Sequence, residues 1–192
     1  MKKFILAALA LFLTVLTVSA QTGSPKFKGI TVAGDASVFV DALKTAGFTY
    51  VAEHDEYYLL KGPFAGFNDC RTIVSRTAAT NMVAKVTAVT EVYSTWFSIR
   101  SDYEDIKEAY TQKYGVPDSD HHFFSPPYKL GDGYEETAVR VDKCHYLTIW
   151  HVDGYTIGIR ITSSMKICIG YENDAIMKVY SDEKESNRIS DI

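Results

Sequence analysis

The sequence predicts an α+β fold, in which meandering strands form one or more antiparallel sheets and two main helices pack on one face. The prediction depends on two helical stripes of apolar residues and on tight hairpin signals between β-rich segments. A parallel sheet needs a helical crossover between most strands, and the sequence lacks them. Of the 192 residues, 46% are apolar and 23% are charged, which suits one domain with a substantial core.

The first 20 residues have the pattern of a signal peptide. Lys2 and Lys3 precede an apolar run of about 15 residues, shorter than the roughly 20 that a bilayer span needs. Small residues before Gln21 predict cleavage after Ala20, although a retained anchor is the alternative. We expect a periplasmic or secreted protein, without stable membrane insertion after cleavage and with a flexible leader over residues 21–26.

The first half of the domain, residues 27–93, is expected to hold one helix and a series of short strands. Residues 27–32 favour a strand, and Asp35 or Ser37 can cap a helix that ends at Gly47. The stretch 62–66 interrupts the β pattern. Further strands are expected at 48–54, 57–61, 70–77 and 83–92, the first two joined at Asp55-Glu56.

The second half, residues 94–181, begins with the clearest helix of the chain. Ser94 can cap this helix, Gly115 ends it, and its apolar stripe consists of Trp96, Ile99, Tyr103, Ile106, Tyr110 and Tyr114. Residues 118–133 form the longest irregular stretch. Strands are then expected at 137–141, 145–152, 155–162 and 166–171, with a tight turn at Asp153-Gly154.

One predicted strand has a buried face and a wet face. Ile157, Ile159 and Ile161 alternate with Thr156, Gly158, Arg160 and Thr162.

The two halves share an order of elements. Each has a helix ended by glycine, a β-rich run and a cysteine that begins a strand, namely Cys70 and Cys144. We therefore expect one domain, residues 27–181, built as a tandem helix-plus-four-strand repeat. The charged residues 182–192 are expected to form a flexible tail.

Four segments carry a resemblance: KTAGF (44–48), LLKGPFAGFNDC (59–70), KYGVP (113–117) and VDKCHY (141–146). They resemble a group of small secreted proteins of unknown function from Bacteroidetes, over most of the mature chain. The resemblance implies export and no particular activity. The order of helices and strands is also similar, in outline, to the β-lactamase inhibitory protein fold, and such a likeness does not give function.

The three cysteines do not predict a disulfide. An odd number leaves at least one thiol unpaired unless two chains pair. Cys144 and Cys168 lie two strands apart in the expected meander, roughly 9–10 Å, which is beyond the reach of a disulfide. The oxidation state of Cys70, Cys144 and Cys168 stays open.

Common catalytic motifs are absent from the sequence, including the Gly-x-Ser-x-Gly elbow, the His-Glu-x-x-His motif and phosphate-binding glycine loops. Asp120, His121 and His122 are weak candidates for a metal site, because adjacent histidines diverge in either a helix or a strand. Cys144 and His145 are adjacent on a strand and point to opposite faces, so they do not form a nucleophile–base pair. We predict no cofactor.

The composition is rich in aromatic residues, with 13 Tyr and 10 Phe. Exposed aromatic side chains mark contact surfaces, and the candidates are Phe123, Phe124, Tyr128 and Trp150. The net charge of −4 gives no electrostatic reason to bind nucleic acid.

We therefore expect a secreted or periplasmic, non-enzymatic binding protein that uses a sheet face or the 118–133 loop. Its partner would be an envelope protein or a glycan. The alternative is a small envelope hydrolase, with or without a metal, that uses His121 or His122, and a third reading is a structural envelope component. The ligand and the oligomeric state stay open.

Overall fold

Eight strands form one antiparallel sheet in the computed structural model, which describes residues 23–190. The α+β class and the antiparallel sheet are thus confirmed. In spatial order the strands are β3 (Thr49–His54), β4 (Tyr57–Phe64), β5 (Phe67–Arg76), β6 (Val83–Val89), β10 (Lys166–Asn173), β9 (Tyr155–Thr162), β8 (Cys144–Val152) and β7 (Ser119–Phe124).

Two runs of strands meet in the middle of the sheet. β3 to β6 pair in chain order, and β7 to β10 pair in chain order from the opposite edge. The two runs join where β6 pairs with β10, with Thr87 opposite Gly170.

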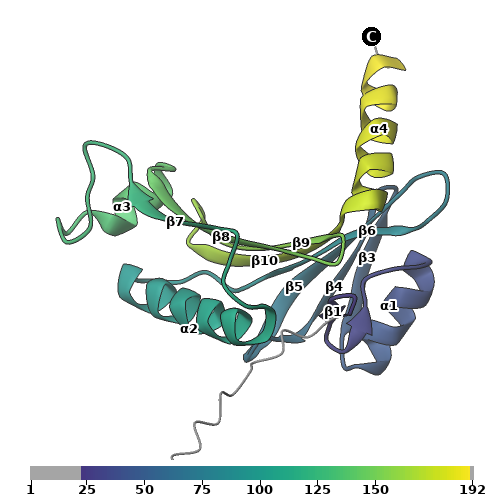
Figure 1. The fold of residues 1–192 in the computed structure, drawn as a ribbon, viewed down its shortest axis with the longest axis horizontal. Coiled ribbons are helices and arrows are strands. Elements are labelled where there is room, and N and C mark those ends of the chain that lie inside the picture. The colour runs from purple at the N-terminus through teal and green to yellow at the C-terminus, as the bar shows by residue number, and fades with distance from the viewer. Residues whose placement is uncertain (1–22, 191–192) are drawn as a thin grey trace, which may run out of the picture.

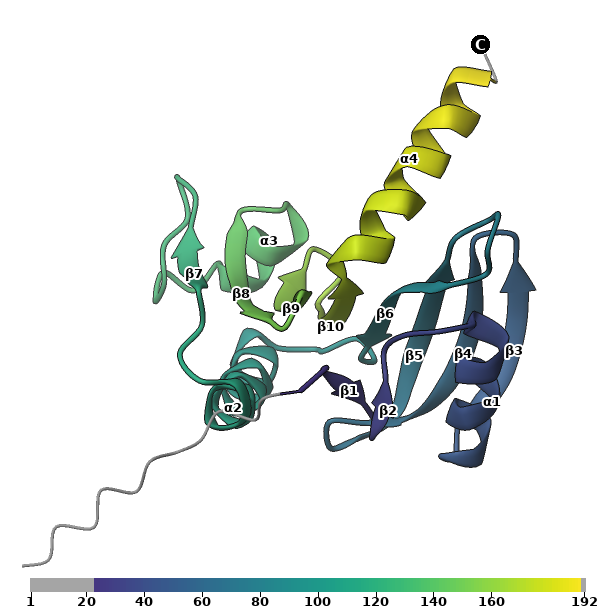
Figure 2. The same cartoon turned by 45° about the vertical axis from the view of Figure 1, so that its right-hand side comes forward.

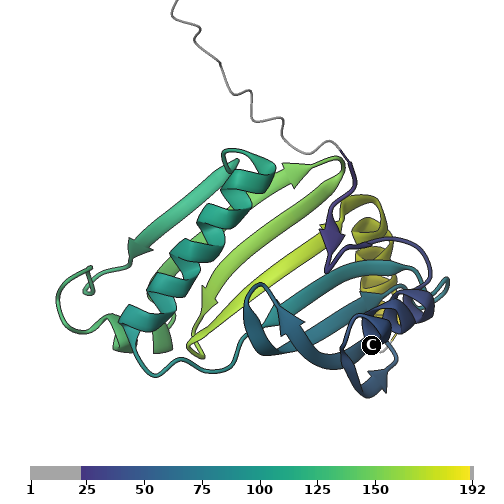
Figure 3. The same ribbon diagram turned by 90° about the horizontal axis from the view of Figure 1, so that it is seen from below.

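Two helices pack against this sheet. α1 (Ala36–Thr45) contacts β5, and α2 (Trp96–Tyr114) contacts β8, β9 and β10. Figure 3 shows α2 lying across the C-terminal strands and α1 at the other end of the sheet. In Figure 1 α4 (Asp174–Ser190) lies on the side of the sheet opposite α2. We call the face of the sheet on which α2 packs the inner face.

Local sequence sets the ends of these helices. The Asp35 carboxylate accepts hydrogen bonds from the N–H groups of Ser37 and Val38 and caps α1. Thr95, rather than the expected Ser94, caps α2 by accepting from the N–H of Ser98 at 3.2 Å. α2 ends at Gly115, whose φ of 90° favours glycine.

The core lies on the inner face of the sheet, beneath α2. The predicted alternation on β9 is confirmed, since Ile157, Ile159 and Ile161 are buried while Arg160 is exposed. Ile99 of α2 is fully buried in the same cluster. Burial of each such side chain stabilises the fold by about 1.5–3 kcal/mol.

A small hairpin replaces the strand expected at 27–32. β1 (Lys26–Phe27) and β2 (Ile30–Thr31) turn through Lys28 and Gly29, which both have positive φ. The hairpin lies between α1 and α2 in Figure 2.

The expectation of a flexible leader is wrong for residues 23–26. Pro25 is buried, and the N–H of Gly23 donates to Asp153 Oδ2 at 2.8 Å. Residues 21–22, the predicted signal peptide 1–20 and its cleavage after Ala20 lie outside the described residues.

Two elements of the second half differ from expectation. The 118–133 stretch is not wholly irregular, because β7 pairs with β8 along its full length. Residues 137–141 belong to a helical turn, α3 (Glu135–Arg140), instead of a strand. Ala138 and Val139 are both buried, and two consecutive buried residues fit a helix better than a strand with one wet face.

In the first half, β4 continues through Gly62 and Pro63, which were expected to interrupt the strand. The Phe48 ring packs directly against Gly62, and a Cβ at this position would lie only 2.5 Å from the ring. Glycine therefore leaves the space that Phe48 occupies beside the strand.

A helix also replaces the expected tail over residues 182–190. α4 extends to Ser190 and projects from the sheet, as Figure 2 shows. The Glu183 carboxylate accepts hydrogen bonds from the N–H groups of Ala78 and Ala79 and ties α4 to the β5–β6 loop. Among the helices of residues 23–190, none combines the length and apolar character that a membrane crossing requires.

Candidate binding site

The side of the sheet opposite the inner face carries a hollow over its central strands. We call this side the open face. Alternate residues of β6, β8, β9 and β10 point toward it, while their neighbours are buried in the core. The hollow has a volume of about 300 Å³ and is lined by Lys85, Thr87, Leu147, Ile149, Thr156, Gly158, Arg160, Cys168, Gly170 and Glu172.

Two glycines form the floor of this hollow. Gly158 of β9 lies directly opposite Gly170 of β10, and the pairing is regular along both strands. Neither glycine has a positive φ, and a Cβ at either position would lie 3.6 Å or more from its neighbours. The backbone therefore does not require glycine at either position, and the neighbouring side chains leave room for a larger residue.

Charged side chains surround the glycine floor. Lys85 forms an ion pair with Glu172 across β6 and β10. Arg160 lies between Leu147 and Cys168 on the neighbouring strands. Among residues 23–190, no carboxylate lies within the 4.0 Å of an ion pair from Arg160.

A second hollow of about 280 Å³ adjoins the first and shares Leu147 and Arg160 with it. Phe123, one of the predicted contact residues, lines this second hollow and is 51% exposed. Its ring stacks on His145 with 4.7 Å between the centroids, and His145 Nε2 is 2.8 Å from Ser125 Oγ. Phe123 is thus held at one end of the open face.

The other predicted aromatic contacts are placed differently. Trp150 is only 1% exposed and donates from Nε1 to the carbonyl of Gly115 at 2.9 Å, so it belongs to the core. Phe124 packs edge-on against Trp96 on the inner face. Tyr128 is half-buried in the loop after β7 and lines neither hollow of the open face.

The adjacent histidines diverge, as predicted. His121 lines the second hollow, while His122 contacts α2 residues on the inner face. His122 Nε2 lies 2.9 Å from Asp120 Oδ1, without the alignment of a hydrogen bond. Within the described part of the chain, no group of three or more His, Cys, Asp or Glu side chains is placed to hold a metal ion.

Asp120 is the centre of a polar cluster beneath α2. Its Oδ2 atom is 2.6 Å from Lys107 Nζ, and its Oδ1 atom accepts a hydrogen bond from Thr148 Oγ1 at 2.8 Å. Thr148 Oγ1 is also 2.6 Å from the Tyr103 hydroxyl. Burial opposes ionisation of Asp120, but its bonds to Lys107 and Thr148 outweigh burial and lower its pKa.

The surroundings of His122 favour the neutral form of its imidazole. Its ring stacks on Tyr146 with 4.7 Å between centroids, and Tyr103 approaches it edge-on. Burial lowers the pKa of His122, and the nearby charges of Asp120 and Glu104 offset only part of this effect.

The three cysteines are free thiols. Burial raises the pKa of Cys144 to about 12 and that of Cys70 to about 11. A nucleophilic cysteine needs a lowered pKa, so neither thiol has the properties of an activated nucleophile. Cys168 lines the hollow, and burial also raises its pKa against the influence of Arg160.

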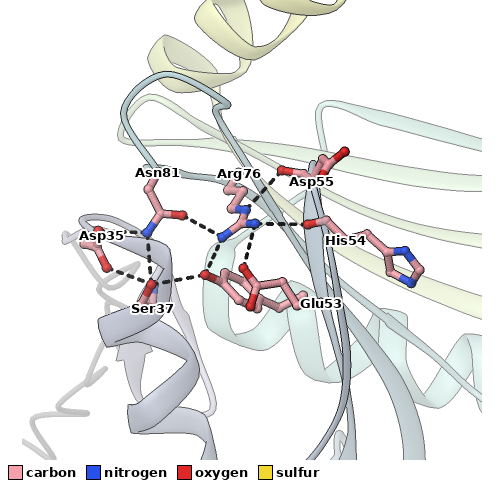
Figure 4. A network of polar contacts seen from close by, with 8 residues as sticks. Asp35, Ser37, Glu53, His54, Asp55, Arg76 and Asn81 are labelled. Carbon is pink, nitrogen blue, oxygen red and sulfur yellow. Dashed lines mark hydrogen bonds and ion pairs between the residues drawn. The ribbon is translucent and has the colours of Figure 1, made fainter.

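A second polar cluster, shown in Figure 4, is structural. Arg76 donates to Glu53 Oε1 at 2.8 Å, to the His54 carbonyl and to Asn81 Oδ1, and it also contacts the Tyr58 hydroxyl. Asn81 in turn donates to Asp35 and Ser37 at the start of α1. Arg76 has partners on every side, so this cluster joins β3, β5 and α1 without offering a free group to a ligand.

Sequence reasoning missed most of the hollow. The alternation on β9 already placed Gly158 and Arg160 on a wet face, but the partner glycine was not visible without the register of β10. No family model, curated protein or solved structure matches this chain. Function is therefore inferred from the open face itself.

Proposed function

We propose that this chain is a secreted or periplasmic, non-enzymatic binding protein that holds a protein partner on its open face. The N-terminal pattern of two lysines, an apolar run and small residues supports export. The hollow over β6, β8, β9 and β10 supports binding, since pockets of about 300–1,000 Å³ are typical ligand sites.

The paired glycines are the observation that carries this proposal. Glycine inside a strand weakens it, and usual reasons for its presence are a bulge, a tight bend or the close approach of another molecule. At Gly158 and Gly170 the register is regular and φ is not positive. Packing does not require glycine either, in contrast to Gly62, where a Cβ would collide with Phe48. The close approach of a partner molecule is then the physical reason for glycine at both positions.

A protein partner fits the hollow better than a glycan does. Sugar sites commonly present exposed aromatic rings, and none of the residues that line the hollow is aromatic. Arg160 offers a guanidinium that suits the carboxylates of a protein surface.

The hydrolase alternative has less support from the geometry. His121 and His122 contact different surroundings, and the buried Cys144 thiol stays protonated at neutral pH.

We also propose that the halves 27–93 and 94–181 are a tandem repeat with both main helices on one face. The order of elements supports this, since α1 precedes β3 to β6 and α2 precedes β7 to β10.

A test of the binding function is to fill the hollow without disturbing the fold. The double variant Gly158→Thr/Gly170→Thr adds side chains where the structure leaves room, and threonine favours strands more than glycine does. We expect an unchanged or higher melting temperature together with loss of the proteins that the wild-type chain recovers from envelope extract. Ser75→Thr is a matched control, since Ser75 is on β5 outside the hollow.

Two outcomes would overturn the proposal. One is equal recovery of the same proteins by the wild type and the glycine double variant. The other is recovery that survives protease treatment of the extract and is abolished by periodate, which would identify a glycan.

A further inference from the structure

A single row of side chains crosses the open face from β9 to β5. By register, Arg160 is opposite Cys168, Cys168 is opposite Val89, and Val89 is opposite Arg71. Both arginines are exposed, while Cys168 and Val89 between them are half-buried. The row thus has a cation at each end and an uncharged middle, beside the glycine floor.

The two arginines are the free cations of this row. Neither Arg160 nor Arg71 has a carboxylate within 4.0 Å among residues 23–190. Two neighbouring lysines are neutralised, since Lys61 pairs with Asp69 at 2.8 Å and Lys85 pairs with Glu172. Lys166, two residues from Cys168 on β10, also has no ion pair among residues 23–190 and adds to the positive charge beside the row. The guanidiniums remain available to a partner.

Their separation matches an extended peptide. Three strand spacings separate β9 from β5, which is about 14 Å. In an extended segment, side chains at i and i+4 point to the same side and are also about 14 Å apart. A segment that crosses the strands can therefore place one carboxylate at each arginine and a side chain at i+2 over the middle of the row.

On the basis of the proposed binding function, we propose that the open face recognises an acidic, extended segment of a partner protein. Arg160 and Arg71 bind carboxylates at positions i and i+4, and guanidinium–carboxylate contacts of this kind can be bidentate. The side chain at i+2 lies over Cys168 and Val89, next to the hollow above Gly170. Strands β6, β9 and β10 are paired on both sides, so side chains rather than added backbone hydrogen bonds make the contact.

Defined peptides test this inference directly. The probe is a fluorescent peptide, Ser-Glu-Ser-Leu-Ser-Glu-Ser, compared with a version that has Gln in place of both Glu. We expect anisotropy to show binding of the Glu peptide and at least about tenfold weaker binding of the Gln peptide. The amide signals of Gly158 and Gly170 should shift in the NMR spectrum during titration with the Glu peptide.

Variants identify the cations that are responsible. Arg160→Gln and Arg71→Gln should each weaken binding of the Glu peptide by about tenfold, because each removes one charged contact. Arg100→Gln is the matched control: Arg100 is also exposed and unpaired within the described residues, but it lies on α2, against the inner face. It should leave the affinity unchanged.

Three results would overturn acidic recognition: no binding of the Glu peptide, equal binding of both peptides, or Arg160→Gln with wild-type affinity. If the glycine double variant still loses the envelope partner in that case, the binding function stands and only the acidic segment is wrong. If the double variant keeps the partner, the binding function itself fails.

Discussion

The Phe27 ring stacks on the Phe64 ring, with 4.0 Å between the centroids and an interplanar angle of 10°. This contact joins the β1–β2 hairpin to the end of β4, and Tyr171 meets both rings edge-on. The N-terminal hairpin is therefore part of the core, not an appendage of the domain.

Phe27→Ala should destabilise the protein by about 3–5 kcal/mol, because it removes a fully buried ring and leaves a cavity. Urea unfolding followed by circular dichroism measures this change. Val38→Ala is the control, since Val38 is 69% exposed on α1 and should change the free energy of unfolding by less than about 0.5 kcal/mol. A loss of under 1 kcal/mol for Phe27→Ala would mean that the hairpin is not held in the core.

Arg76→Gln should cost about 2 kcal/mol of stability, since it breaks charge-assisted hydrogen bonds to Glu53 and to the carbonyl of His54. Chemical denaturation against wild type checks this value. Arg71→Gln, on the same strand but without such partners in the described chain, should be nearly neutral. Equal stability of the two variants would contradict a structural role for the Arg76 cluster.

Regular apolar patterns predicted the elements that form the core. The apolar stripe from Trp96 to Tyr110 predicted the helix α2. The alternation of residues on β9 predicted which of its side chains are buried and which face solvent. β7 escaped prediction because Asp120 and His122, which face a polar cluster beneath α2, replace the apolar residues that normally reveal a strand.

Long-range register explains why the open face was not predicted. Gly158 meets Gly170 only because β9 pairs with β10 in one register. Arg160 and Arg71 share a row only because β6 pairs with β10 in the middle of the sheet. A one-residue slip of either pairing would send these side chains to the other face, and local sequence does not fix that choice.

His122 should make the fold less stable as the pH falls below 6.5, the ordinary pKa of a histidine. Its pKa in the folded state is lowered from 6.5, so the unfolded chain takes up a proton first and is favoured below that value. The groups around it are Asp120 on β7 and Arg100, Glu104 and Lys107 on α2.

The variant His122→Asn should flatten this dependence of stability on pH, because it removes the titrating group. Urea unfolding at a series of pH values measures the slope. His121→Asn makes the same change one residue away, on the open face, and should retain the wild-type slope. An unchanged slope in His122→Asn would show that other groups cause the effect.

Alkylation of the native protein should modify Cys168 before the other two thiols. Cys70 and Cys144 are buried and protonated, with pKa values of about 11 and about 12, whereas Cys168 is half-buried at the hollow. Mass spectrometry after brief treatment with N-ethylmaleimide should find one adduct, which the Cys168→Ser variant lacks. Rapid labelling of Cys144 without denaturant would contradict its burial.

Glu183→Gln should release α4 from the β5–β6 loop. The carboxylate accepts from the N–H groups of Ala78 and Ala79 at 2.6 and 3.1 Å, and an amide offers only one accepting oxygen in its place. The loss should be about 1 kcal/mol, since the contact is partly exposed, and it should appear as faster hydrogen exchange at Ala78 and Ala79. Glu185→Gln is the matched control and should leave the exchange rates unchanged. In the described part of the chain Glu185 contacts only Arg188, which also belongs to α4. Equal exchange rates in the two variants would mean that other contacts hold α4, such as the ion pair of Lys184 with Glu56, which a Lys184→Met variant would then test.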